Sequence, residues 1–413
     1  MKICFLFNHD QVHQVSHSLP IALALADAGT GAEIVLAVTS DRMRAEIVRH
    51  AGPAISRGDM TLVMLGLRQR GSRLLAGVCE GVVPATKLLV YRDNLEFFRS
   101  LDVLVVAEKT SLVLRRRYGL DRLKIIHTRH GAGDRAIGFN KHSATFDHVL
   151  VSGSKIRQRL HREAGVPFNR MSLIGYPKFD LMPEPAPRLP FQANGKPTVL
   201  YNPHPSPHLS SWYAQGRAVL EHFLHDDRYN LIFAPHVMLF HRKFVLTIDK
   251  FRIDRAGVIE QRFLDAPNIH VDLGSAASTD MTYTAAADIY LGDVSSQVYE
   301  FLHTPRPCLF LNAHATPWDG DANYAHWQAG EVVTGTADLG AALDRAVAQH
   351  DRYRPVQRAL FQRSFELTAE RSAVRAARAV MSVLGDTVPA VLPERELETV
   401  TGLQSGLQGL RVA

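Results

Sequence analysis

One continuous segment of the chain reads ADIYLGDVSSQVYEFLHTPRPCLFL, residues 287–311. Its first apolar run, 288–291, is followed by Gly292 and then by two hydroxyls, Ser295 and Ser296, at the start of a short helical pattern. Prolines then end the helix before a second apolar run, 308–311. This order predicts a βαβ crossover, in which ligands meet the carboxyl ends of the strands, so a phosphate is expected near the two serines.

The composition is that of an ordinary globular protein. The chain has 413 residues, of which 46% are hydrophobic and 21% are charged, so two domains of about 200 residues each are expected. The net charge of +6 suits an anionic ligand or an anionic membrane surface. The basic residues are spread along the chain rather than gathered in one tract, so no nucleic-acid partner is expected.

The cysteines and the first residues predict a cytoplasmic protein. Cys4, Cys79 and Cys308 lie far apart and match no zinc-site spacing, which is typical of buried thiols in a reducing compartment. The apolar run at residues 3–7 is too short for a signal peptide or a spanning helix. We therefore expect a cytoplasmic location, with peripheral attachment to the inner face of the membrane as a further expectation.

The first half of the chain alternates apolar runs with helical patterns. The runs that predict buried strands are residues 2–7, 33–38, 102–107, 124–128 and 148–152. Helical patterns lie between them, at 18–26, 92–100 and 112–118. Such alternation is what a doubly wound parallel sheet requires, so an α/β domain is predicted over residues 1–182.

The second half repeats this organisation after a segment rich in proline. Residues 183–197 contain five prolines and are predicted to link two domains. The next apolar runs predict strands at 198–201, 231–234, 269–271, 288–291, 308–311 and 331–333. A second α/β domain is therefore expected over residues 198–385.

Two features lie near the C-terminal end of the sequence. Residues 356–384 form a long helical pattern rich in Ala and Arg, which is expected to pack back across both domains. The tail, 386–413, carries Leu and Val at roughly helical spacing, but its glycines weaken any helix. A frayed end, a dimer contact and a membrane-surface segment are the alternatives for it, and no oligomeric state is predicted.

Histidines follow two of the predicted strands in tight-turn surroundings. The segment HTRHGAGDR, 127–135, contains His130 beside Gly131, and APHV, 234–237, contains His236. A histidine at the carboxyl end of a strand, beside glycines that admit a substrate to the backbone, suits a general base or a phosphate partner. The plain structural alternative is a loop histidine that binds nothing.

Three further polar groups have a functional and a structural interpretation. YNPHPSPH, 201–208, either walls a ligand cleft with Asn202 and His204 or forms a rigid proline turn. The two serines either bind phosphate or cap their helix. Asp293 would repel a phosphate if it faced one, so we expect it to orient the loop.

A metal site is a further alternative for one histidine group. His9, His13 and His17 would share one face of a helix. No helix start precedes them, so we predict no metal site there.

These segments together resemble the CDP-glycerol glycerophosphotransferase family of teichoic acid assembly and, more loosely, other two-domain nucleotide-sugar transferases of the GT-B type. The resemblance covers about residues 128–312, and the order and spacing of its short motifs make it specific. The motifs are TRHG at 128–131, GYPKFD at 175–180, YNP at 201–203, APH at 234–236, and DVSS at 293–296 with Glu300 following.

The resemblance implies a fold and a set of residue roles. The fold would be GT-B, an α/β architecture of two doubly wound, Rossmann-like domains facing an interdomain cleft. His130 would be the catalytic base. Ser295 and Ser296 would hold the donor pyrophosphate, with His236 as a second phosphate contact and Glu300 as a ribose ligand.

The chain departs from the family around the predicted base. The family usually has an aromatic residue before the His-Gly pair and Thr-Pro after it, whereas this chain has Arg129 before it and the residues 132–135, AGDR, after it. These departures concern the acceptor side. The remaining candidates for the cleft are Gly131, Asp134, Arg135, Asn202, His204 and Asp293.

The function implied is a transferase that moves a glycerophosphate or glycosyl group from a nucleotide-activated, CDP-linked donor to a cell-surface polysaccharide or a lipid-linked acceptor. The donor is a substrate, and no cofactor and no metal are expected. One alternative is an inverting GT-B glycosyltransferase of capsule or lipopolysaccharide synthesis that uses a CMP- or UDP-sugar. The others are a sugar-nucleotide epimerase and a nucleotide-binding protein without turnover.

Overall fold

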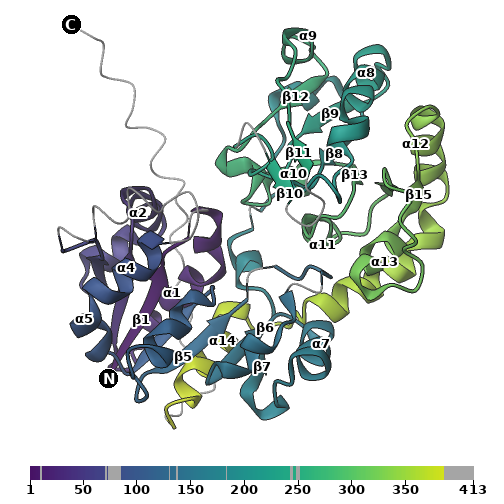
Figure 1. Cartoon of the computed structure of the whole chain (residues 1–413). Helices are drawn as coiled ribbons and strands as arrows, with labels where there is room; N and C mark the ends of the chain where they lie inside the picture. The colour runs from purple at the N-terminus through teal and green to yellow at the C-terminus, as the bar shows by residue number, and fades with distance from the viewer. Residues whose placement is uncertain are drawn as a thin grey trace, which may run out of the picture.

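A computed structural model describes residues 1–9, 12–69, 72, 85–129, 131–135, 138–182, 184–241, 245–247 and 252–385. The chain forms two parallel sheets flanked by helices, one below the other in Figure 1. His130, Cys79 and the tail 386–413 lie outside the described residues. The limits of the two domains and of the linker stay a prediction.

The first sheet has seven parallel strands in the order β3-β2-β1-β4-β5-β6-β7. Their bounds are β1 Lys2–Phe7, β2 Glu33–Val38, β3 Thr61–Met64, β4 Val103–Val106, β5 Lys124–Thr128, β6 His148–Val151 and β7 Met171–Leu173. The five predicted strands are confirmed. The two edge strands, β3 and β7, were not predicted; both are short and only partly buried.

The second sheet has six parallel strands in the order β12-β9-β8-β13-β14-β15. Their bounds are β8 Thr198–Asn202, β9 Asn230–Phe233, β12 Ile269–Val271, β13 Ile289–Gly292, β14 Cys308–Leu311 and β15 Glu331–Val333. All six predicted strands are confirmed. The strand order reverses between β8 and β13, and the carboxyl ends of strands at such a switch point form a crevice. A short antiparallel pair, β10 Val245–Thr247 and β11 Arg252–Asp254, was not predicted.

Helices cover both sheets. In the first half they are α1 Leu19–Asp27, α2 Asp41–Ser56, α4 Ala85–Asp93, α5 Leu95–Arg99, α6 Val113–Arg116 and α7 Ser154–Ala164. In the second half they are α8 Arg217–His225, α9 Gln261–Leu264, α10 Thr282–Ala286, α11 Gln297–Phe301, α12 Leu339–Ala348, α13 His350–Ser364 and α14 Ser372–Ser382. The helical pattern expected at 92–100 is split between α4 and α5.

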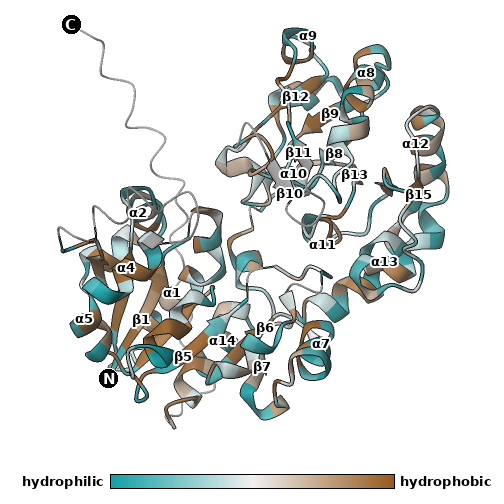
Figure 2. Ribbon diagram, in the orientation of Figure 1, coloured by the Kyte–Doolittle hydropathy of each residue, from teal (hydrophilic) through white to brown (hydrophobic). Residues whose placement is uncertain are grey.

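The cores follow from the two-residue period of the strands. In β1, Ile3, Phe5 and Phe7 pack into one core with α1, α2 and α14. Cys4 and Leu6 point to the opposite face and pack into a second core with α4 to α7. The strands are accordingly hydrophobic in Figure 2, whereas outer helices such as α13 carry much hydrophilic surface. A helix layer therefore covers each face of the first sheet.

The helical pattern at 356–384 is two helices, α13 and α14, so the expectation of one long helix is wrong. Asp180 accepts hydrogen bonds from the amides of Ser372 at 3.2 Å and Ala373 at 2.7 Å, and so starts a new helix at α14. Helix α14 then packs against α1 in the first core, where Ala376 and Ala377 are fully buried. The C-terminal helix thus returns to the first sheet (Figure 1).

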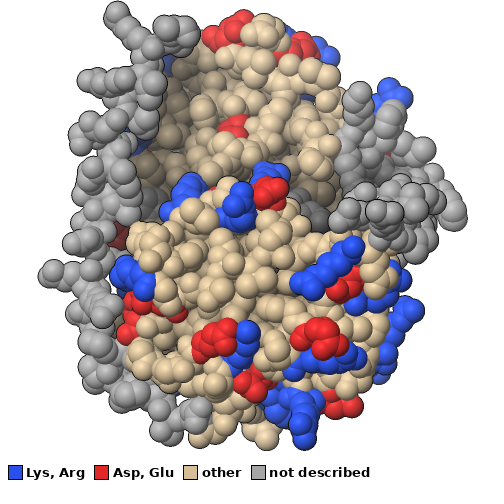
Figure 3. Space-filling view, turned by 90° about the vertical axis from the view of Figure 1, so that its left-hand side faces the viewer, with Lys and Arg blue, Asp and Glu red and all other residues tan. Residues whose placement is uncertain are grey.

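The face of the described surface in Figure 3 carries charges of both signs. Within the described part of the chain, no helix is long and apolar enough to cross a membrane. Figure 3 shows Lys and Arg interspersed with Asp and Glu on the lower part of the described surface, with a hollow above it. Attachment to an anionic membrane therefore stays a prediction.

Candidate functional site

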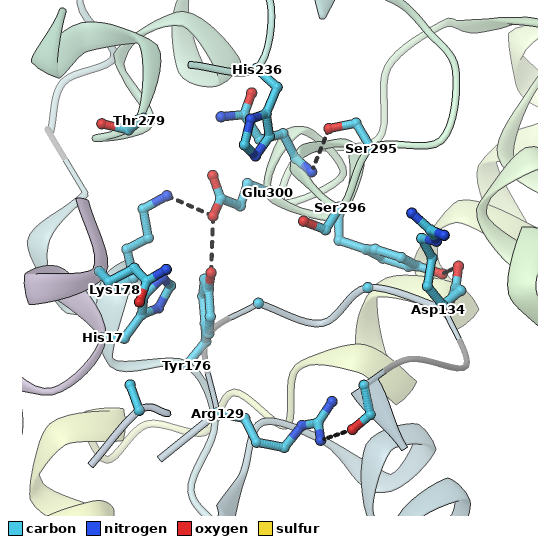
Figure 4. Close-up of a pocket in the computed structure, with 18 of the residues that line it drawn as sticks. His17, Arg129, Asp134, Tyr176, Lys178, His236, Thr279, Ser295, Ser296 and Glu300 are labelled. Atoms are coloured by element: carbon cyan, nitrogen blue, oxygen red, sulfur yellow. Dashed lines mark hydrogen bonds and ion pairs between the residues drawn. The ribbon is translucent and has the colours of Figure 1, made fainter. Parts of the chain in front are cut away.

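A cleft of about 580 Å³ lies where residues following the strands of both sheets meet. Eight of the predicted site residues line it: Ser295, Ser296, His236, Glu300, Gly131, Asp134, Arg135 and His204. Asn202 and Asp293 do not line it, and His130 lies outside the described residues. Figure 4 shows residues from both halves of the chain around this cleft.

Three neighbouring strands bring the second-sheet residues together. Strand β8 pairs with β9 on one side and with β13 on the other, and Asn202 at the end of β8 is in register with Gly292 at the end of β13. Parallel strands end at one edge of the sheet, so the loops that carry His204, His236 and Ser296 meet there. The switch point of the sheet is thus the floor of the cleft.

His204 and His236 sit in matching turns. The Nδ1 atom of His204 accepts a hydrogen bond from the amide of Ser206 at 3.0 Å, and Nδ1 of His236 accepts one from Met238 at 3.2 Å. A neutral ring whose Nδ1 accepts carries its proton on Nε2. Each histidine therefore keeps an Nε2 donor for a ligand.

Burial keeps both histidines neutral. It lowers the pKa of His236 to about 4. It also lowers the pKa of His204 well below its usual value, and the charges of His236 and Arg135 lower it further. A neutral histidine can still donate a hydrogen bond to a phosphate. Neither of these histidines changes its protonation state near neutral pH, so both can keep this role there.

Asp293 organises the loop that carries His204. It is fully buried and accepts hydrogen bonds from the amides of His204 at 2.8 Å and Ser211 at 2.6 Å, and from the Ser211 hydroxyl at 2.8 Å. Burial raises the pKa of Asp293 to about 6, although these bonds oppose the rise. Asp293 does not line the cleft, and its carboxylate holds the backbone of the His204 loop, as an orienting residue would.

The two serines differ in what their hydroxyls can do. The hydroxyl of Ser295 donates to Oδ1 of Asn202 at 2.7 Å, and Nδ2 of Asn202 donates to the carbonyl of Ala234 at 2.6 Å. Ser296 is exposed and makes no side-chain capping bond. A serine has one proton to donate, so Ser295 joins β13 to β8 while Ser296 keeps its donor for the cleft.

A buried carboxylate forms another side of the cleft. Oε1 of Glu300 accepts hydrogen bonds from Nζ of Lys178 at 2.7 Å and from the hydroxyl of Tyr176 at 3.0 Å. Its Oε2 is buried and has no hydrogen-bond partner in the part of the chain that the structure describes. Such an unpartnered acceptor is costly unless a ligand donates to it. Figure 4 shows Lys178 and Tyr176 meeting Glu300 across the cleft.

Asp134 joins the two halves of the chain through a buried polar network. Its Oδ1 accepts from Nζ of Lys155 at 2.8 Å. Its Oδ2 accepts from the hydroxyl of Tyr299 at 2.6 Å and from Nδ1 of His326 at 3.0 Å. Burial alone would raise the pKa of Asp134, but the bond from His326 and the charge of Lys155 lower it far below its usual range.

Two glycines let the first-sheet loop approach the second sheet. Gly131 has a φ of +78°, and a Cβ added to it would lie 3.7 Å from Oγ of Ser296. A Cβ on Gly133 would lie 3.3 Å from Cβ of Ser296, which is a tight contact. The segment that follows His130 therefore lies directly against the serine that is free to bind a ligand.

Several site residues escaped prediction from sequence. Arg129, Tyr176, Lys178, Lys155 and His326 all interact in or beside the cleft. Three of them lie within the segments TRHG and GYPKFD, so those motifs were the signal that could have found them. Lys155 and His326 lie on a helix and a 3₁₀ segment with no distinguishing pattern.

The described part of the chain also bears on metal binding. Within it, no group of three or more His, Cys, Asp or Glu side chains is arranged to hold a metal ion. The side chain of His13 is outside the described part.

Solved structures share this arrangement of two sheets. The wall teichoic acid polymerase TagF superposes with a TM-score of 0.56 at 12% identity, covering 93% of this chain and 89% of TagF. The fold is of the GT-B type. UDP-bound MnaA of S. aureus gives 0.56 at 12% identity, covering 95% and 98%. UDP-GlcNAc 2-epimerase from Neisseria meningitidis, bound to UDP-GlcNAc, gives 0.54 at 13%, covering 93% and 99%.

These likenesses show the fold, and the structural neighbours include enzymes that act on nucleotide-linked substrates. No protein-family model matches the chain, and no curated protein matches it by sequence.

Proposed function

We propose that this protein is a GT-B enzyme that binds a nucleotide-activated donor at the carboxyl ends of β8, β9 and β13. It would transfer a glycerophosphate or glycosyl group from that donor to a polysaccharide or lipid-linked acceptor. The observation that carries the proposal is one cleft lined by three uncharged donors, Nε2 of His204, Nε2 of His236 and the hydroxyl of Ser296, with the free carboxylate oxygen of Glu300 nearby.

These groups match the parts of a nucleoside diphosphate. The three donors suit the phosphate oxygens, and hydrogen bonds to charged groups contribute about 1.5 to 3 kcal/mol each. Fixed donors aimed at the leaving phosphate would stabilise the negative charge that grows there during transfer. Oε2 of Glu300 would accept a hydrogen bond from a ribose hydroxyl.

The hydroxyl of Ser295 has a different part in this proposal. Because its proton is engaged with Asn202, it supports the loop, and Ser296 makes the direct phosphate contact. Arg135 lines the same cleft as a cation within reach of the phosphate region.

His130 would take the proton from the acceptor hydroxyl. This role comes from the resemblance of the RHG segment, and two observations support it. Arg129 and Gly131, on either side of His130, both line the cleft, and Gly131 approaches Ser296 closely. The base would thus act between an acceptor on the first sheet and a donor on the second.

The ligands of structural neighbours support a nucleotide donor and leave two candidate reactions. A TagF variant was solved after a soak with CDPG, and the Neisseria meningitidis epimerase was solved with UDP-GlcNAc. A transferase is our first candidate because the motif order resembles that of the glycerophosphotransferases. A sugar-nucleotide epimerase is the second, because the UDP-GlcNAc 2-epimerase from Neisseria meningitidis superposes with a TM-score of 0.54, close to the 0.56 of TagF.

The released nucleotide separates these reactions. We would incubate the protein with CDP-glycerol or UDP-GlcNAc, with and without a hydroxyl acceptor that carries a phosphate, and identify nucleotides by chromatography. Attack on the β-phosphorus of CDP-glycerol transfers glycerophosphate and releases CMP, whereas attack on the anomeric carbon of a UDP-sugar releases UDP. We expect CMP release that depends on the acceptor.

The same incubation can also give results that contradict the proposal. Conversion of UDP-GlcNAc to its C2 epimer without loss of nucleotide would establish the second candidate. Absence of nucleotide release and of epimerisation with every donor would contradict both.

A further inference from the structure

Two cations line the first-sheet wall of the cleft. Arg129 follows β5 and Lys109 follows β4, and these strands are neighbours in the sheet. Figure 4 shows Arg129 on the wall opposite His236 and Ser296. The cations therefore lie across the cleft from the residues assigned above to the donor.

One short segment holds both cations with uncharged partners. Nη1 of Arg129 donates to the carbonyl of Gly138 at 2.7 Å, and its guanidinium carbon lies 4.8 Å from the ring centre of Phe139. Nζ of Lys109 donates to Oδ1 of Asn140 at 2.9 Å. These contacts fix the positions of the two cations without balancing their charges.

Neither cation is paired with a carboxylate of the described residues, although Glu108 also lines the cleft. The carboxylate of Glu108 accepts instead from Asn8 at 2.8 Å and from Tyr91 at 2.8 Å. Nε of Arg129 is buried and has no hydrogen-bond partner among the described residues. An unbalanced pair of cations with an unused donor in one cavity is what an anion site requires.

The pKa values of both cations are lowered, which agrees with this geometry. Burial lowers the pKa of Lys109, and the charge of Arg129 lowers it further. Burial also lowers the pKa of Arg129 to about 10, with a further contribution from the charge of Arg159. Both shifts mean that the protonated forms lack a counter-charge, which a bound anion would supply.

We propose that Arg129 and Lys109 bind a phosphate group carried by the acceptor. The planar fork of arginine matches phosphate oxygens, and lysine adds a point charge. Two positive charges balance a phosphate monoester better than a carboxylate, which carries a single negative charge. In the family that the chain resembles, an aromatic residue usually stands where this chain has Arg129. The inference rests on the proposed function, which places the donor on the opposite wall.

Calorimetric titration of the full chain tests this site. The probes are glycerol 3-phosphate, glycerate and glycerol, each titrated with and without saturating CDP. We expect wild-type protein to bind glycerol 3-phosphate more tightly than glycerate and to bind glycerol least. Arg129→Met should weaken glycerol 3-phosphate binding about 10-fold to 100-fold, because it removes charge-assisted hydrogen bonds. Lys109→Met should weaken it about 10-fold.

Two further variants separate loss of the site from loss of the fold. Arg122→Met removes the same charge at an exposed position outside the cleft and should leave the affinity unchanged. Arg129→Lys keeps the charge but not the fork, so it should recover part of the affinity. Thermal melting of each variant shows whether the segment that Arg129 contacts is still folded.

Three results would overturn the inference. The first is that wild type does not bind glycerol 3-phosphate at millimolar concentration. The second is that a folded Arg129→Met or Arg129→Lys variant binds it with the same affinity as wild type. The third is that glycerate binds as tightly as glycerol 3-phosphate. If Arg129→Met weakens CDP as much as glycerol 3-phosphate, the cations serve the donor instead. Failure of the proposed function would be seen separately, as an absence of CDP binding. The titration of glycerol 3-phosphate without CDP would still test the site at Arg129 and Lys109.

Discussion

Asp134→Ala is expected to lower the free energy of unfolding by about 3 to 5 kcal/mol, the usual effect of removing one partner of a buried ion pair. Nζ of Lys155, 2.8 Å from Asp134, lies in a residue that is only 8% exposed, so the variant leaves a buried charge without its partner. Tyr299 and His326 lose the same acceptor. Because these residues come from both halves of the chain, the variant should also loosen the cleft.

Urea denaturation measures this loss, and three variants serve as controls. Asp121→Ala removes an exposed carboxylate and should change the free energy of unfolding by less than about 0.5 kcal/mol. Asp134→Asn keeps an acceptor oxygen but loses the charge, so an intermediate loss is expected. Asp134→Ala combined with Lys155→Met removes the stranded charge and should recover part of the stability. An Asp134→Ala protein as stable as Asp121→Ala would contradict the role of this network.

The dependence of the free energy of unfolding on pH tests the same interaction. The pKa of Asp134 is lower in the folded protein than in the unfolded chain, where it is about 4. Its contribution is therefore fully present above pH about 4 and is lost as the pH falls below that value. We expect wild type to lose stability more steeply than Asp134→Asn in this acid range.

His130→Ala is expected to reduce the rate of transfer by about 10² to 10⁴, the usual contribution of a general base. The nucleotide affinity should stay close to that of wild type, because the proposed donor contacts come from His204, His236 and Ser296 on the second sheet. A fall in kcat with unchanged donor binding separates a base from a phosphate contact.

A steady-state assay of nucleotide release measures this effect. His225→Ala is the matched control, because the side chain of His225 is exposed on α8, outside the cleft. It should transfer at the wild-type rate. Wild-type turnover by His130→Ala would show that another group takes the proton.

Most strands could be predicted from the sequence because they are buried on both faces. Strands β8, TVLYN, and β13, IYLG, are fully buried, and the consecutive apolar residues in each make the run visible without any alignment. The edge strands β3, TLVM, and β7, MSL, are short and partly exposed, and they were not predicted. The break between α13 and α14 depends on Asp180, which is about 190 residues away in sequence, so local periodicity could not reveal it.

Some residues of the site could be predicted from their position along a strand. His204, His236 and Ser296 each follow a buried strand, and the ends of neighbouring parallel strands meet at one edge. Lys155 and His326 reach Asp134 through tertiary packing. The difference between Ser295 and Ser296 depends on one hydrogen bond to Asn202, which the sequence of the pair does not contain.

The central claim is that a nucleotide binds on the second sheet through Ser296 and the two histidines. The most direct measurement is a thermal-shift titration of CDP, CMP, UDP and GDP with wild type, Ser296→Ala and His236→Ala. We predict that CDP or UDP stabilises wild type by about 3 kcal/mol at a hundredfold excess over its Kd. Each variant should melt near wild type without ligand and show a smaller shift with it. Equal shifts in wild type and both variants, or no shift with any nucleotide, would contradict the claim.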